Sequence, residues 1–197
     1  ADDDDDAADD DDAADDDDAA DDDDAADDDD AADDDDDAAS GLAPGDLIVT
    51  EVMSNPAVVD DSIGEWFELL NLSSDGINLS GWQLSDRGTD SVTISPGKPL
   101  TIPPGQYMVL GRSTNASENG GATVLWAYGA DFSLGNSADE IVLTEPGGAE
   151  IYALEYPSTF PNPSGEATQL SGDLLTYADS LDLAGNWCIA TDAGASS

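Results

Sequence analysis

The residues Gly64–Asn71 read GEWFELLN, the clearest strand pattern in the chain. Its aromatic and branched apolar residues follow one another without helical spacing, which is typical of a β-strand with a buried side. The sequence therefore predicts a strand over Glu65–Asn71. The polar stretch before it, Asp60–Gly64 (DDSIG), ends in glycine and predicts a loop.

Similar short apolar segments, separated by Gly, Pro, Asn and Ser, occur on both sides of this strand. They predict nine further strands at Leu47–Met53, Gly81–Ser85, Ser91–Ile94, Leu100–Ile102, Gln106–Leu110, Val124–Tyr128, Glu140–Thr144, Ile151–Tyr156 and Trp187–Ala190. The stretch Glu145–Ala149 (EPGGA) predicts a hairpin between its neighbours. No segment after Leu42 has helical periodicity, and the connections are too short for crossover helices. The chain is therefore predicted to be all-β, with mainly antiparallel strands.

The first 39 residues contain only Asp and Ala, with 26 Asp, arranged as a DDDDAA repeat. Asp is a weak helix former, like charges one turn apart destabilise a helix, and Ala alone provides no core. We therefore predict a disordered polyaspartate linker over residues 1–41, a folded domain over residues 42–190 and a frayed C-terminal end over residues 191–197. The linker is interpreted as a spacer that also attracts cations weakly.

The charge of the chain excludes several classes of partner. It has 47 acidic residues against three basic ones, Arg87, Lys98 and Arg112, for a formal net charge of −44. Three scattered bases cannot bind nucleic acid or an anionic membrane surface, and no apolar run in this segment is long enough to insert into a bilayer. Protein and glycan partners remain open, and the oligomeric state is not predicted. A surface this acidic is also typical of proteins that work at high salt, so we expect salt-dependent stability.

Histidine is absent, which excludes the usual general base and the Ser-His-Asp arrangement, so no enzyme activity is predicted. The single cysteine, Cys188, is predicted to be a small, partly buried apolar side chain. The alternative is a cysteine whose disulfide partner lies outside the chain.

Six motifs in the domain resemble those of the lamin-tail domain family, in the family's order. They cover roughly residues 46–172, at Glu51–Pro56, Gly64–Asn71, Asn78–Asp86, Ile102–Tyr107, Ser133–Leu143 and Gly147–Tyr156. The resemblance implies an immunoglobulin-like antiparallel β-sandwich. It also implies a non-catalytic binding or adhesion module of the prokaryotic secreted or cell-surface type, a type often found beside nucleases, phosphatases or anchor segments. The stretch before the domain is polyaspartate rather than a coiled coil, so no chromatin role is expected.

The motif residues predict a core and a set of constrained acids. Trp66, Phe67, Leu69, Trp82 and Leu84 have the size to fill the space between two sheets. The aromatic residues Tyr107, Trp126, Tyr128, Tyr152 and Tyr156 are also assigned to the core rather than to a ligand platform. Glutamates within strands must be hydrogen-bonded or paired, so Glu51, Glu65 and Glu68 are expected to accept hydrogen bonds from loop N–H groups.

Calcium is the one cofactor that the sequence suggests, and only as weak binding. Clustered carboxylates beside a turn are suitable ligands for Ca²⁺, and two such clusters occur. The candidate metal ligands are Asp60, Asp61, Glu65, Asp139 and Glu140. Acids are so abundant in this chain that such clusters also arise by chance.

The predicted function is a non-catalytic binding or adhesion module of an extracellular or cell-surface protein, displayed on an acidic spacer. The alternative is a structural accessory domain that positions a neighbouring enzyme, such as a nuclease or phosphatase, in a longer protein.

Overall fold

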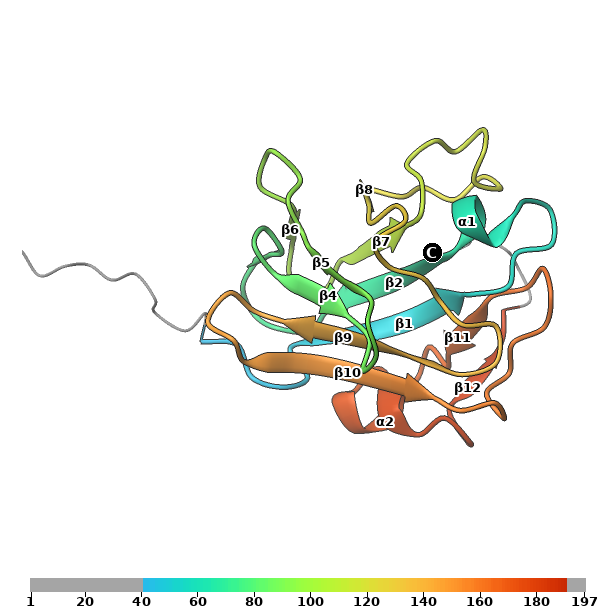
Figure 1. The fold of residues 1–197 in the computed structure, drawn as a ribbon. Helices are drawn as coiled ribbons and strands as arrows, with labels where there is room; N and C mark the ends of the chain where they lie inside the picture. The colour runs from blue at the N-terminus through green and yellow to red at the C-terminus, as the bar shows by residue number, and fades with distance from the viewer. Residues whose placement is uncertain (1–40, 191–197) are drawn as a thin grey trace, which may run out of the picture. The chain divides into compact units, whose positions relative to one another are not determined.

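The structure is a computed structural model, and it describes residues 41–190 (Figure 1). The predicted frayed C-terminal end and almost all of the predicted linker lie outside the described residues. Within residues 41–190, the chain folds into two β-sheets and a small two-stranded ribbon, so the all-β prediction is confirmed.

The larger sheet has six strands in the spatial order β12-β11-β1-β2-β7-β8. Its strands are β1 (Leu47–Met53), β2 (Trp66–Asn71), β7 (Tyr107–Gly111), β8 (Trp126–Ala127), β11 (Thr168–Leu170) and β12 (Trp187–Ile189). Neighbouring strands are antiparallel except β7 and β8, which run parallel. A register shift between Val49 and Glu51 makes a bulge in β1, which leaves Thr50 without a partner residue on β2.

The smaller sheet has four strands in the order β10-β9-β4-β5, all antiparallel. Its strands are β4 (Gln83–Ser85), β5 (Ser91–Thr93), β9 (Asp139–Thr144) and β10 (Glu150–Tyr156), and the separate ribbon pairs β3 (Ile77–Asn78) with β6 (Thr101–Ile102). The predicted hairpin is confirmed, because β9 and β10 pair on either side of Glu145–Ala149.

The core lies between the two sheets and consists of buried apolar side chains. Phe67 and Leu69 of β2 and Leu84 of β4 are completely buried, and Trp82 is 2% exposed, as the sequence predicted. Phe67 also packs against two rings from the chain after β8, with its centroid 6.0 Å from that of Tyr128 and 6.5 Å from that of Phe132. This aromatic group fixes the segment after β8 to the middle of the larger sheet.

The sequence after Leu42 showed no helical periodicity, and no helix was predicted there. The structure has two single-turn helices, α1 (Asp61–Gly64) and α2 (Tyr177–Leu181). Each begins at a side-chain cap, since Asp60 accepts a hydrogen bond from the Ser62 N–H and Thr176 accepts one from the Asp179 N–H. Helices of four or five residues are too short to produce a periodic apolar pattern.

Two strands were not predicted, β3 and β11, because two or three residues carry no alternation that could be recognised. None of the helices within residues 41–190 has the length and apolar character needed to cross a membrane.

Candidate functional site

One face of the larger sheet points away from the smaller sheet, and we call it the outer face. Residues that pair across antiparallel strands share a face. Phe67 of β2 points into the core, so its neighbours Trp66 and Glu68 point outward. Their partners on β1 are Met53 and Glu51. The outer face therefore presents an apolar pair beside an acidic pair.

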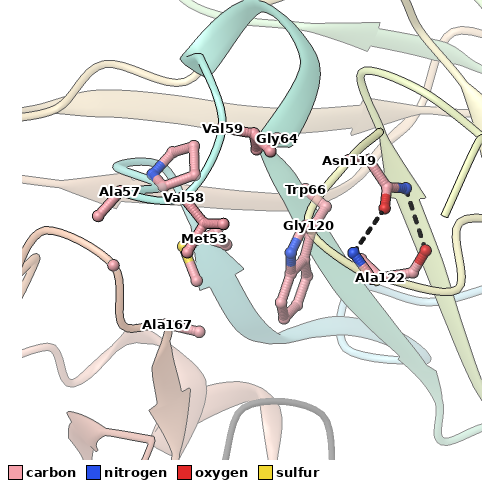
Figure 2. A pocket seen from close by; sticks show the side chains of 13 residues that line it. Met53, Ala57, Val58, Val59, Gly64, Trp66, Asn119, Gly120, Ala122 and Ala167 are labelled. Carbon is pink, nitrogen blue, oxygen red and sulfur yellow. Dashed lines mark hydrogen bonds between the residues drawn. The ribbon is translucent and has the colours of Figure 1, made fainter. Parts of the chain in front are cut away.

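The apolar pair forms the floor of a cavity of about 190 Å³ (Figure 2). Met53, Trp66 and the buried Ala167 line it from the sheet side, and residues 56–59 and 119–122 line it from two loops. Figure 2 shows the nitrogen-bearing edge of the Trp66 indole turned towards the side on which Met53 lies. Val58, which also lines the cavity, is 89% exposed, so an apolar side chain stands in water at this site.

Local sequence explains how the loop at residues 119–122 is held. Asn119 is only 3% exposed, and its amide donates to the carbonyl oxygens of Ser113 and Ala122 at 2.8 and 3.0 Å. Its side-chain oxygen accepts from the Gly121 N–H at 3.1 Å, so one buried side chain sets the shape of the loop. Gly111 lies opposite Trp66, and a Cβ at this glycine would come within 3.0 Å of the Trp66 Cβ.

The acidic pair lines a second cavity, of about 160 Å³, which shares Trp66, Gly121 and Ala122 with the first. Glu51 and Glu68 are directly opposed across β1 and β2. Glu68 is 7% exposed and accepts a hydrogen bond from the Thr50 hydroxyl at 2.8 Å. The carboxylate of Glu51 receives no hydrogen bond from any residue within 41–190. Two carboxylates are therefore opposed on neighbouring strands, and the Thr50 hydroxyl donates a hydrogen bond to only one of them, Glu68.

This arrangement makes it costly to ionise both acids. Burial, and then the charge of Glu68, raise the pKa of Glu51 to about 7. Burial also raises the pKa of Glu68, while the Thr50 hydroxyl opposes that change. A positive charge placed between the two acids would remove the repulsion, and the site is therefore suited to a cation.

Glu65 is not part of this acidic pair and has a structural role. It is 3% exposed, its Oε2 lies 3.1 Å from Nε of Arg112, and the same oxygen accepts a hydrogen bond from the Leu134 N–H. Arg112 also donates through Nη1 to the carbonyl oxygens of Gly129 and Phe132, both at 2.7 Å. Burial raises the pKa of Glu65, while the Leu134 N–H and the Arg112 guanidinium act against that change. Glu65 directly precedes β2, and Arg112 directly follows β7. The hydrogen bonds of this ion pair therefore connect the ends of both strands to the segment after β8.

The five candidate metal ligands are divided among structural hydrogen bonds. Asp60 caps α1, Asp61 accepts from the side chain of Asn136 at 2.8 Å, and Glu65 pairs with Arg112. Asp139 accepts from the N–H groups of Gly135 and Glu140, and Glu140 accepts from the Arg87 N–H. Within residues 41–190, no group of three or more acidic or cysteine side chains is arranged to hold a metal ion. Weak calcium binding gains no support from this geometry and stays a prediction.

Loop N–H groups were expected to satisfy the three glutamates. The structure agrees only for Glu65, because Glu68 uses a hydroxyl and Glu51 has no donor within the described residues. Tyr128, Tyr152 and Tyr156 are buried as predicted, and Trp126 is half-buried.

Three side chains differ from their predicted places. Trp66 lies on the outer face instead of in the core between the sheets, and Tyr107 is 40% exposed on the same face. The signal that could have placed Trp66 is Glu68, because residues two apart on a strand share a face. Cys188 was predicted to be partly buried but is exposed, since it lies on the edge strand β12 opposite Gln169.

The two sheets and the core between them define an immunoglobulin-like β-sandwich. The chain belongs to the Lamin Tail Domain family, whose model matches residues 41–158. This family consists of non-catalytic immunoglobulin-like domains, so the resemblance found in the sequence motifs is confirmed. No curated protein matches the chain.

Proposed function

We propose that this domain is a non-catalytic binding module of a secreted or cell-surface protein, displayed on the acidic linker, and that it contacts its partner through the outer face of the larger sheet. The observation that carries the proposal is the apolar cavity over Met53 and Trp66 with the exposed Val58 beside it. A domain in this family has no catalytic residues of its own, and an exposed apolar hollow with a polar surround is suited to recognition.

The size of the hollow limits what it can hold. A cavity of about 190 Å³ is smaller than a typical pocket for a drug-sized molecule, which begins at about 300 Å³. It accommodates one or two side chains of a protein partner. The partner is therefore proposed to be a protein, with the rest of the contact made by the surrounding strands and loops.

The test compares the full chain with two variants on a protein array of extracellular and surface proteins. Val58→Asp places a charge at the cavity and is expected to abolish specific binding, because an apolar contact cannot take up an unpaired carboxylate. Gln83→Asp, on the exposed part of β4 in the other sheet, is the matched control and is expected to bind like the unmodified chain. Both variants have the same net charge.

Equal loss of binding in the two variants would contradict the proposal, because the binding would then depend on overall charge. Binding that both variants retain would place the contact elsewhere and would equally count against the outer face. Thermal unfolding of each variant checks that the fold is intact.

A further inference from the structure

We propose that the outer face binds a basic, apolar-flanked segment of a partner protein, with one lysine or arginine side chain between Glu51 and Glu68 and an adjacent apolar side chain in the cavity over Met53 and Trp66. The inference deepens the proposed function and depends on it.

The two parts of the site are adjacent on the same sheet. Trp66 and Glu68 are two residues apart on β2, a separation of about 7 Å along an antiparallel strand. The linings of the two cavities share Trp66, Gly121 and Ala122, so an apolar cavity and an acidic cavity lie next to each other, and we call the two together the groove. A partner segment that places a cationic side chain at the acidic end therefore brings an adjacent side chain to the apolar end.

The charge of the acidic end is not balanced by the bases of the described chain. Arg87 pairs with Glu150 at 2.7 Å and with Glu155 at 3.3 Å, and Arg112 is held by Glu65. Lys98 makes no ion pair within residues 41–190 and lies in the turn between β5 and β6, neither of which is a strand of the larger sheet. The positive charge that would relieve the repulsion between Glu51 and Glu68 must therefore come from another molecule.

The surroundings favour a side-chain cation on an apolar stem over a bare ion. A lysine or arginine has a long apolar stem that can lie along the Trp66 ring while its charged head reaches the carboxylates. Among residues 41–190, two acids line the groove, whereas calcium requires six to eight oxygen ligands. The Trp66 wall also offers contact to apolar atoms that a hydrated ion cannot use.

Few titratable groups of residues 41–190 face this position. Glu51 and Glu68 come from β1 and β2, Tyr107 from β7, and Cys188 from β12 at the far end of the same row of paired residues. Burial, and then the charge of Glu68, raise the pKa of Tyr107, so the phenol stays neutral when the two acids ionise. Binding should therefore strengthen as the pH rises through about 7, where Glu51 loses its proton.

The experiment measures the affinity of the full chain for the peptide acetyl-Ser-Leu-Lys-Leu-Ser-Gly-amide by titration calorimetry. The polyaspartate stretch attracts any cation, so the buffer contains about 1 M salt, where the Debye length is about 3 Å and exposed charges are screened more strongly than half-buried ones. The same peptide with acetyl-lysine in place of lysine tests whether the charge is needed.

Two double variants with the same net charge separate the site from general attraction. Glu51→Gln with Glu68→Gln is expected to weaken binding about tenfold, because it removes both carboxylates from the half-buried position. Glu118→Gln with Asp173→Asn changes two exposed acids and is expected to alter the affinity less than about twofold. Trp66→Ala is expected to weaken binding to a similar degree as the first double variant.

Equal weakening in the two double variants, or equal affinity for the acetylated peptide, would overturn the inference. Failure of the peptide to bind at all would also overturn it. The proposed function would still stand if Val58→Asp abolished binding on the protein array while the glutamate double variant did not, because the site would then bind an uncharged segment.

Discussion

Arg112 forms an ion pair with the Glu65 carboxylate and donates hydrogen bonds to the carbonyl oxygens of Gly129 and Phe132. Replacing it by methionine keeps most of the apolar volume but leaves a buried carboxylate without its cation. We expect Arg112→Met to lower the free energy of unfolding by about 3 kcal/mol at pH 8, as for other broken buried pairs. Urea unfolding measures the change.

The loss caused by Arg112→Met should be smaller at pH 5, where the isolated Glu65 takes up a proton and needs no counter-charge. Arg87→Met is the control, because Arg87 and Glu150 are 47% and 42% exposed and such pairs contribute about 1 kcal/mol or less. Equal losses in the two variants would show that the Glu65 pair is no more important than a surface contact.

Glu51 makes stability depend on pH in a defined direction. Its pKa rises from 4.5 to about 7 on folding, so the folded state holds the proton more tightly than the unfolded chain. The resulting penalty is absent below about pH 4.5, grows between pH 4.5 and 7 and is complete above pH 7. We therefore expect Glu51→Gln to raise the free energy of unfolding by about 1 kcal/mol at pH 8, allowing for partial solvent access, and to leave it unchanged at pH 4.

Urea unfolding of the unmodified chain, Glu51→Gln and Glu118→Gln at the two pH values gives the comparison. Glu118 is exposed, so Glu118→Gln removes one charge without changing a buried side chain. A gain from Glu51→Gln that is the same at pH 4 and pH 8 would contradict the assignment, because titration of Glu51 would then have no effect on folding.

The family match ends at residue 158, but the larger sheet continues beyond it. β11 pairs with β1, β12 pairs with β11, and Trp187 packs on Phe160 with ring centroids 5.4 Å apart. The Trp187 indole also donates to the Ser180 carbonyl oxygen at 2.9 Å. Residues 159–190 are therefore part of the folded domain.

We expect a chain that ends at residue 158 to unfold or aggregate, because β1 becomes an open apolar edge and the core loses a buried tryptophan. Removing only residues 191–197 is the control and is expected to leave the melting temperature unchanged. Circular dichroism melting and size-exclusion chromatography provide the readout. A monomeric, cooperatively melting chain 1–158 would show that the last two strands are dispensable.

Local sequence predicts the elements that carry their own pattern. The strand at Trp66–Asn71, the β9–β10 hairpin and the buried Phe67 and Leu69 all follow from apolar runs and turn residues. The pairing of Glu51 with Glu68 cannot be predicted in this way, because it depends on the register between β1 and β2 and on the bulge at Thr50. The two strands join through a loop whose length does not fix that register. The acidic end of the groove could therefore be recognised only in the structure.

Repulsion between acids affects the molecule as a whole. The chain has a formal net charge of −44, of which residues 40–197 contribute −18. Such a charge destabilises a compact state, and salt screens it, with a Debye length of about 10 Å at 0.1 M and about 3 Å at 1 M. We expect the melting temperature to rise by about 10 °C or more between 0.05 M and 2 M sodium chloride, since a gain of about 1 kcal/mol shifts it by several degrees.

A chain of residues 40–197 separates the contribution of the domain from that of the polyaspartate stretch. If the repulsion arises among the acids of the domain, the shorter chain should show the same rise in melting temperature with salt. If the −26 of residues 1–39 acts on the domain, the rise should be smaller in the shorter chain. Sucrose at matched osmotic strength controls for general exclusion from the protein surface. A melting temperature that does not change with salt in either chain would mean that the acidic surface contributes no net repulsion to the folded state.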